Sequence, residues 1–133
     1  MKEFYTRTNA NKGIKFPLKT PDGGDTEHWL MILGVDSDEF QRAEHVAKRE
    51  IGVLQTECKF IEDDTEKEEK FFTGTDQINR DTLASLVSAW SFDKKCTRAE
   101  VSKFLKEAPQ IANAINTLAG KRMLFHKSAG KHS

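Results

Sequence analysis

The side chains that most often perform chemistry are scattered through this sequence without a recognisable spacing. The four histidines and two cysteines form no C-x-x-C or H-E-x-x-H pattern, the arrangements typical of zinc sites. Asp36 and Asp38 begin like a calcium loop, but Gln41 and Ala47 stand where its glycine and final glutamate belong. We therefore expect no catalytic residue, no metal, no cofactor and no enzymatic activity. A zinc site assembled from distant residues is the alternative left open.

Charge divides the chain into an acidic and a basic part. The 21 basic and 21 acidic residues cancel, so no global excess of positive charge is available to bind nucleic acid as a main partner. Residues 36–70, however, hold twelve acids and six bases, whereas residues 71–133 hold ten bases and five acids. Two interpretations stay open: solvated surfaces of opposite sign, or head-to-tail attraction between subunits of a homo-oligomer.

Length and hydropathy predict one domain in a soluble protein. A chain of 133 residues is long enough to bury a core without a disulfide or metal. No run of 18 apolar residues suggests a membrane span, and the N-terminus lacks the apolar segment of a secretory signal. Two cysteines, Cys58 and Cys96, are best explained as buried thiols of a cytoplasmic protein.

The first 35 residues predict an arm followed by a β-hairpin. Residues 1–13 are polar and aperiodic, so we expect a loose arm. Apolar and polar side chains alternate over residues 14–19, and Pro17 places this strand at an edge. The turn residues Pro21–Asp25 lead into a second apolar run at residues 27–35. The hairpin 14–35 needs helices to cover it, because two strands alone are only marginally stable in water.

The remaining chain predicts helices. Apolar residues recur every three or four positions from Phe40 to Ile61, which predicts a long helix over about 36–63. The acidic residues that follow would oppose its dipole, so fraying is expected over 63–70. A helix over about 76–90 would begin at Thr75 or Asp76. Thr97 and Glu100 form a capping box that begins a helix over 98–108, and Pro109 can open another over 109–119.

Several aromatic residues are candidates for a partner surface. Phe71 and Phe72 lie beside the acidic stretch and either join the core or contact a partner. Residues 120–133 predict a basic flexible tail, and its apolar cluster is the second candidate: Met123, Leu124 and Phe125. Trp29 and Trp90 are interpreted as core anchors. The predicted fold is therefore mainly α, a small helical domain over 14–119 with an N-terminal β-hairpin.

The pattern in the C-terminal half resembles that of tail assembly chaperones of long-tailed, siphovirus-type bacteriophages and prophages. The resemblance spans about residues 14–119 and rests on five segments: Thr26–Leu30, Gly34–Phe40, Trp90–Asp93, Cys96–Leu105 and Glu107–Ile115. It implies a non-enzymatic morphogenesis factor of the host cytoplasm that is absent from the mature virion. It also implies binding to the tape measure protein, and to the tail tube protein through an extended product.

Two other functions remain as alternatives to this resemblance. The first is a structural head–tail or tail component that stays in the virion. The second is a small nucleic-acid-binding regulator built on the helical C-terminal half. None of the three needs a catalytic residue.

Overall fold

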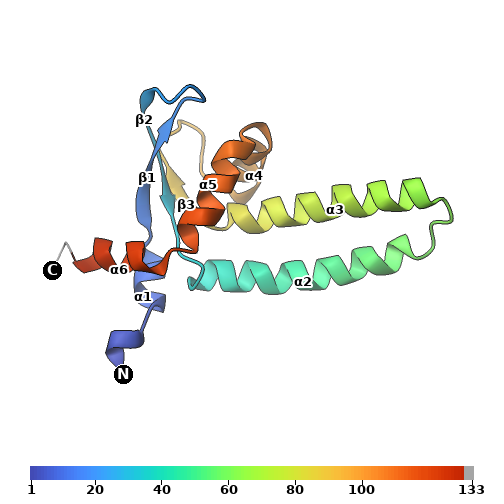
Figure 1. Cartoon of the computed structure of the whole chain (residues 1–133), viewed down its shortest axis with the longest axis horizontal. Helices are drawn as coiled ribbons and strands as arrows, with labels where there is room; N and C mark the ends of the chain where they lie inside the picture. Colours follow the sequence, from blue (N-terminus) through green and yellow to red (C-terminus); the bar gives the residue numbers. More distant parts are fainter. Residues whose placement is uncertain (131–133) are drawn as a thin grey trace.

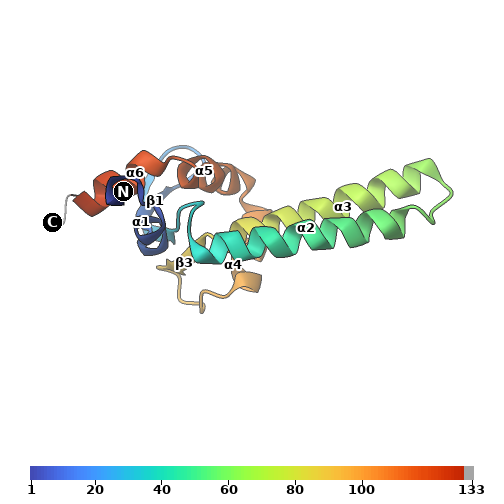
Figure 2. The same cartoon turned by 90° about the horizontal axis from the view of Figure 1, so that it is seen from below.

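The computed structural model describes residues 1–130, and the surroundings of side chains through residue 126. It consists of a compact body and a two-helix arm that projects from it in both views (Figures 1 and 2). The predicted fold class, mainly α with a small antiparallel sheet, is confirmed. The elements, in order, are a 3-10 turn Lys2–Phe4, α1 Arg7–Lys12, β1 Ile14–Lys19, β2 Asp25–Ile32, α2 Asp38–Cys58, α3 Asp64–Ala84, β3 Val87–Trp90, α4 Arg98–Glu107, α5 Pro109–Ala119 and α6 Arg122–Gly130.

The expected hairpin is part of a three-stranded antiparallel sheet with the order β1-β2-β3. Pro17 lies on the edge strand β1, as predicted. The third strand is a correction, because residues 87–90 were expected to be helical. Leu86, Val87 and Trp90 fit a helical face, but β2 offers an unpaired edge, and pairing there satisfies backbone groups that a longer helix would leave open.

One face of the sheet forms the core with α4, α5 and the end of α3. Leu30 and Ile32, two residues apart on the central strand, are completely buried and point to the same face. Trp90 packs beside this core against Phe92 and Phe104, with edge-on ring contacts of 5.2 and 6.1 Å. Trp29 is a correction: it lies outside the core cluster, half-buried, with the Lys15 ammonium 4.6 Å from its ring centre.

The arm consists of α2 and α3, and both helices differ from their predicted bounds. The first ends at Cys58 instead of residue 63, and the second begins at Asp64 instead of residue 76. The acidic residues therefore do not fray a C-terminus. Asp63 caps the N-terminus of α3 by accepting the Glu66 amide at 2.9 Å, where negative charge suits the helix dipole. The Thr73–Thr75 segment continues the helix instead of breaking it.

Both ends of the chain are more ordered than expected. Residues 7–12 form α1, with Ala10 buried, instead of a loose arm. Residues 122–130 form α6, and Phe125 is buried beside Gly34. These two helices lie next to each other at one end of the body (Figure 1). Of the basic tail 120–133, residues 131–133 lie outside the described residues.

The segment 33–38, between β2 and α2, connects most of the body. The amides of Leu33, Gly34 and Val35 donate to the carbonyls of Leu86 in the α3–β3 turn, Ala10 in α1 and Ala119 in α5, at 2.7, 3.0 and 3.1 Å. Ser37 is fully buried and caps α2. Two arginines also bind this segment through paired hydrogen bonds: Arg7 to Asp38 at 2.7 and 2.8 Å, and Arg122 to Asp36 at 2.6 and 2.9 Å.

Gly13, between α1 and β1, packs closely against Ile32 and Leu33, where this segment begins. Gly13 has a φ of +76°, and an added methyl group would lie 2.7 Å from the Ile32 carbonyl oxygen. We expect Gly13→Ala to lower the free energy of unfolding by about 1–3 kcal/mol in urea titrations. Gly52→Ala, on the open side of α2, is the control and should stabilise by up to about 1 kcal/mol. Equal effects of the two substitutions would contradict the close approach.

The two arginine clamps predict acid sensitivity. Hydrogen bonds from Arg122 and Arg7 lower the pKa values of Asp36 and Asp38, respectively. Groups with a lowered folded pKa stabilise fully above their unfolded value, about 3.9, and this contribution is lost as the pH falls through the folded value. Urea titrations across this range should therefore show a smaller loss of stability for Asp36→Asn/Asp38→Asn than for the wild type. Parallel curves would show that the clamps contribute nothing.

Candidate partner-binding cleft

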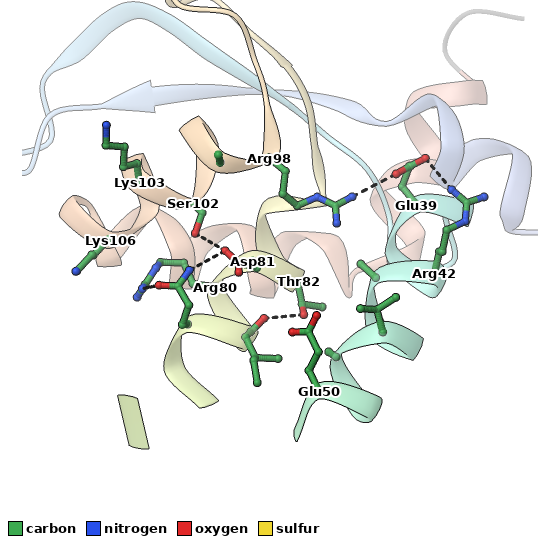
Figure 3. A pocket seen from close by; sticks show the side chains of 16 residues that line it. Glu39, Arg42, Glu50, Arg80, Asp81, Thr82, Arg98, Ser102, Lys103 and Lys106 are labelled. Atoms are coloured by element: carbon green, nitrogen blue, oxygen red, sulfur yellow. Dashed lines mark hydrogen bonds and ion pairs between the residues drawn. The ribbon is translucent and has the colours of Figure 1, made fainter. Parts of the chain in front are cut away.

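An open cleft lies where the base of the arm meets α4. Its volume is about 760 Å³, and three helices line it: α2, α3 and α4. Cavities of about 300–1,000 Å³ are the size at which proteins hold ligands. The central wall, α3, packs against both α2 and α4, so the cleft is built on rigid elements (Figure 3).

The cleft combines an apolar lining with a mostly cationic set of charges. Its apolar side chains are small, so space is left between the helices; they are Ala43, Val46, Ala47, Ile78 and Ala99. Among the charged lining residues, five are basic and three are acidic: Arg42, Arg80, Arg98, Lys103 and Lys106, with Glu39, Glu50 and Asp81. An apolar lining under a positive rim suits an amphipathic segment that carries acidic side chains.

The cations differ in how they are paired. Glu39 holds Arg42 at 3.2 Å and Arg98 at 3.4 Å, which links α2 to α4. Arg80 binds Asp76 at 2.8 Å along α3. Within the described residues, Lys103 and Lys106 form no ion pair, and both extend from α4 (Figure 3). These two ammonium groups are therefore available to an anionic partner.

A polar contact joins the α3 and α4 walls of the cleft. The Ser102 hydroxyl, which is buried, donates to the Asp81 carboxylate at 2.7 Å. Gln77 also donates to Asp81, at 2.9 Å. Neither the Asp81–Ser102 nor the Glu39–Arg98 pair is adjacent in sequence, so both form only in the folded chain. Ser102 and Asp81 hold α4 against α3. Among the described residues, neither is placed beside a group that would activate it as a nucleophile or base.

The aromatic residues singled out from the sequence do not line this cleft. Phe71 and Phe72 lie within α3, further out along the arm. Phe71 is half-buried, whereas Phe72 is 70% exposed. Phe72 therefore remains available to a partner. The sequence analysis missed Phe60, which lies at the turn between α2 and α3 and is 83% exposed.

The C-terminal apolar cluster divides between two roles. Phe125 is 4% exposed and packs near Ala10 and Gly34, with which it lines a small pocket, so it is a core residue instead of a partner contact. Met123 is 69% exposed, and Leu124 is exposed beside it. Both residues belong to α6, which lies at the opposite end of the molecule from the arm (Figure 1). The structure does not bring the two predicted surfaces together.

Comparisons of the chain with protein families, curated proteins and solved structures find no match. Within the described residues, no three His, Cys, Asp or Glu side chains gather as potential metal ligands. None of the helices in this part of the chain is long and apolar enough to cross a membrane.

The contact between α3 and α4 can be tested by removing one hydroxyl. Ser102→Ala takes a buried donor from the Asp81 carboxylate, so we expect the free energy of unfolding to fall by about 1.5 kcal/mol. Ser88→Ala, an exposed serine on β3, is the control and should change stability by less than about 0.5 kcal/mol. Urea titration measures both. No difference between the variants would mean that this bond does not hold the helices together.

Proposed function

We propose that this chain is a non-enzymatic tail assembly chaperone of a long-tailed phage. In this proposal it acts in the host cytoplasm, binds a helical segment of the tape measure protein in the cleft, and promotes tail-tube assembly. The observation that carries the binding mode is the open cleft, which is lined by small apolar side chains and, on α4, by two lysines that form no ion pair among the described residues. A helix laid into such a groove presents apolar residues every three or four positions.

The residues described next carry the family resemblance, and they stabilise the fold of the body instead of lining the cleft. Trp90 and Phe92 form an aromatic cluster with Phe104. Ser91 accepts the Trp29 amide at 2.8 Å, which joins the end of β3 to β2. Thr97 caps α4, and Pro109 opens α5. Such residues define the body of the protein, and the binding surface depends on what surrounds them.

The charges of the cleft indicate which kind of tape measure segment, the client of the proposed chaperone, would bind there. Lys103 and Lys106 favour acidic side chains along the edge of the bound tape measure helix. Burial of apolar client residues among alanines gives a shallow interface, which suits reversible binding. Reversible burial would suppress aggregation of the client, and tube subunits would later displace the chaperone.

Co-expression with the tape measure protein encoded beside this chain tests the proposal. We expect a stable complex in size-exclusion chromatography with light scattering. Ala99→Trp, an exposed substitution that fills the cleft, should reduce the co-purified client by about tenfold or more, which corresponds to about 1.4 kcal/mol of binding free energy. Asn113→Trp, exposed on α5 outside the cleft, is the matched control and should leave the complex intact.

Two results would overturn parts of this proposal. Absence of any complex with the tape measure protein would contradict the chaperone function. Loss of the complex in Phe72→Ser but not in Ala99→Trp would move the client site from the cleft to the arm. Mass spectrometry of purified phage particles separately distinguishes a chaperone from a structural tail component, because the chaperone should be absent from the particles and the structural component present.

A further inference from the structure

The end of the arm has the opposite chemistry to the cleft. The acidic tip, residues 60–69, contains six acids and one base, and it begins with Phe60. Phe60 is 83% exposed at the turn between the helices. The acids are Glu62, Asp63, Asp64, Glu66, Glu68 and Glu69. The tip thus presents an aromatic side chain beside negative charge, whereas the cleft presents an apolar lining beside positive charge.

We propose that the acidic tip of one copy binds in the cleft of a second copy. Phe60 would enter the apolar space between α2, α3 and α4, where a volume of about 760 Å³ is ample for one aromatic ring. The carboxylates around it would then face Lys103 and Lys106, which form no ion pair among the described residues. This arrangement assigns a partner to both surfaces at once.

The two surfaces cannot meet within one chain. Ala47 lines the cleft, and Cys58 ends α2 near the tip. The eleven residue steps from Ala47 to Cys58 span about 16 Å of helix at 1.5 Å per residue. Because the arm is built from two continuous helices, it cannot fold back by that distance (Figure 2). The contact therefore joins different copies of the chain.

Different surfaces on the two partners make the contact heterologous. After one tip has bound one cleft, the pair still carries a free cleft and a free tip. Such contacts generate closed rings or open chains of subunits, depending on the rotation between neighbours. Attraction between exposed charges is screened over about 8–10 Å at ordinary salt, so the association should weaken as salt rises.

This inference rests on the cleft being a binding site, as proposed above, and identifies a second occupant for it. The tip would compete with an acidic client helix for the same lysines. Self-association itself requires only the purified chain. Its test therefore contains no tape measure protein, and its failure is distinguishable from a failure to bind the client.

Sedimentation velocity of the full chain, at about 0.05 M and about 0.5 M salt, tests self-association. We expect oligomers at low salt that dissociate at high salt. Two variants should each raise the dissociation constant by about tenfold or more: the tip variant Phe60→Ser and the cleft variant Lys103→Glu/Lys106→Glu. The matched controls are Phe72→Ser, an exposed aromatic outside the tip, and Lys95→Glu/Lys121→Glu, exposed lysines outside the cleft. These controls should associate like the wild type.

Mixing the two variants gives the decisive result. The tip variant retains a working cleft, and the cleft variant retains a working tip, so an equimolar mixture should form one-to-one dimers and nothing larger. A wild type that is monomeric at both salt concentrations would overturn the proposal. So would a mixture that stays monomeric while each variant keeps the wild-type circular dichroism spectrum, or variants that both associate like the wild type.

Discussion

The backbone of residues 33–38 is the constraint on which the rest of this structure depends. Its buried amides must find acceptors, since an unpaired buried N–H costs about 1–3 kcal/mol. Those acceptors come from three separate parts of the chain, namely Ala10, Leu86 and Ala119. Satisfying this short segment therefore fixes α1, the start of β3 and the end of α5 together. The arm begins at Ser37, inside the same network, so its direction is fixed by the body.

Electrostatics serves two different purposes in this chain. Near residues 33–38, bidentate arginine–aspartate pairs attach the terminal helices to the body. Elsewhere, charge depends on position: acids gather at the far end of the arm, whereas Lys103 and Lys106, which form no ion pair among the described residues, lie on α4 beside the cleft. The stability of α3 explains some of the acids at the far end, because negative charge at the start of the helix suits its dipole and Asp63 caps it. The cap does not explain Glu68 and Glu69, which lie beyond the first turn.

The sequence alone predicted what local rules decide. The N-cap at Thr97, the opening of α5 at Pro109 and the edge position of Pro17 follow from short-range chemistry, and the structure contains all three. The return bond of the predicted capping box does not form, because the Thr97 amide donates to the Lys95 carbonyl at 3.0 Å instead of to Glu100. The first half of α3 escaped prediction because its inner face carries Gly74, against which Leu54 packs closely, instead of a large apolar residue. The apolar period is therefore interrupted at the position where Leu54 packs against α3.

The cleft could not be predicted for a different reason. Its α3 lining residues, Gln77 to Thr82, all lie within the helix predicted over about 76–90, but the sequence does not specify how α2, α3 and α4 pack around them. Its key contacts also join residues far apart in sequence, as in the 59-residue separation of Arg98 and Glu39. The charge asymmetry was visible from composition alone. Its meaning depended on which helix each charge occupied.

The two-helix arm has a further consequence, which concerns how such a protein can change over evolution. Outside the body, α2 packs against α3, and the far end of the arm projects away from the rest of the described chain. Matched insertions of seven residues in each helix would preserve the packing pattern and extend the arm by about 10 Å. The reach of the molecule is thus a variable that can be altered by small duplications while the body stays unchanged.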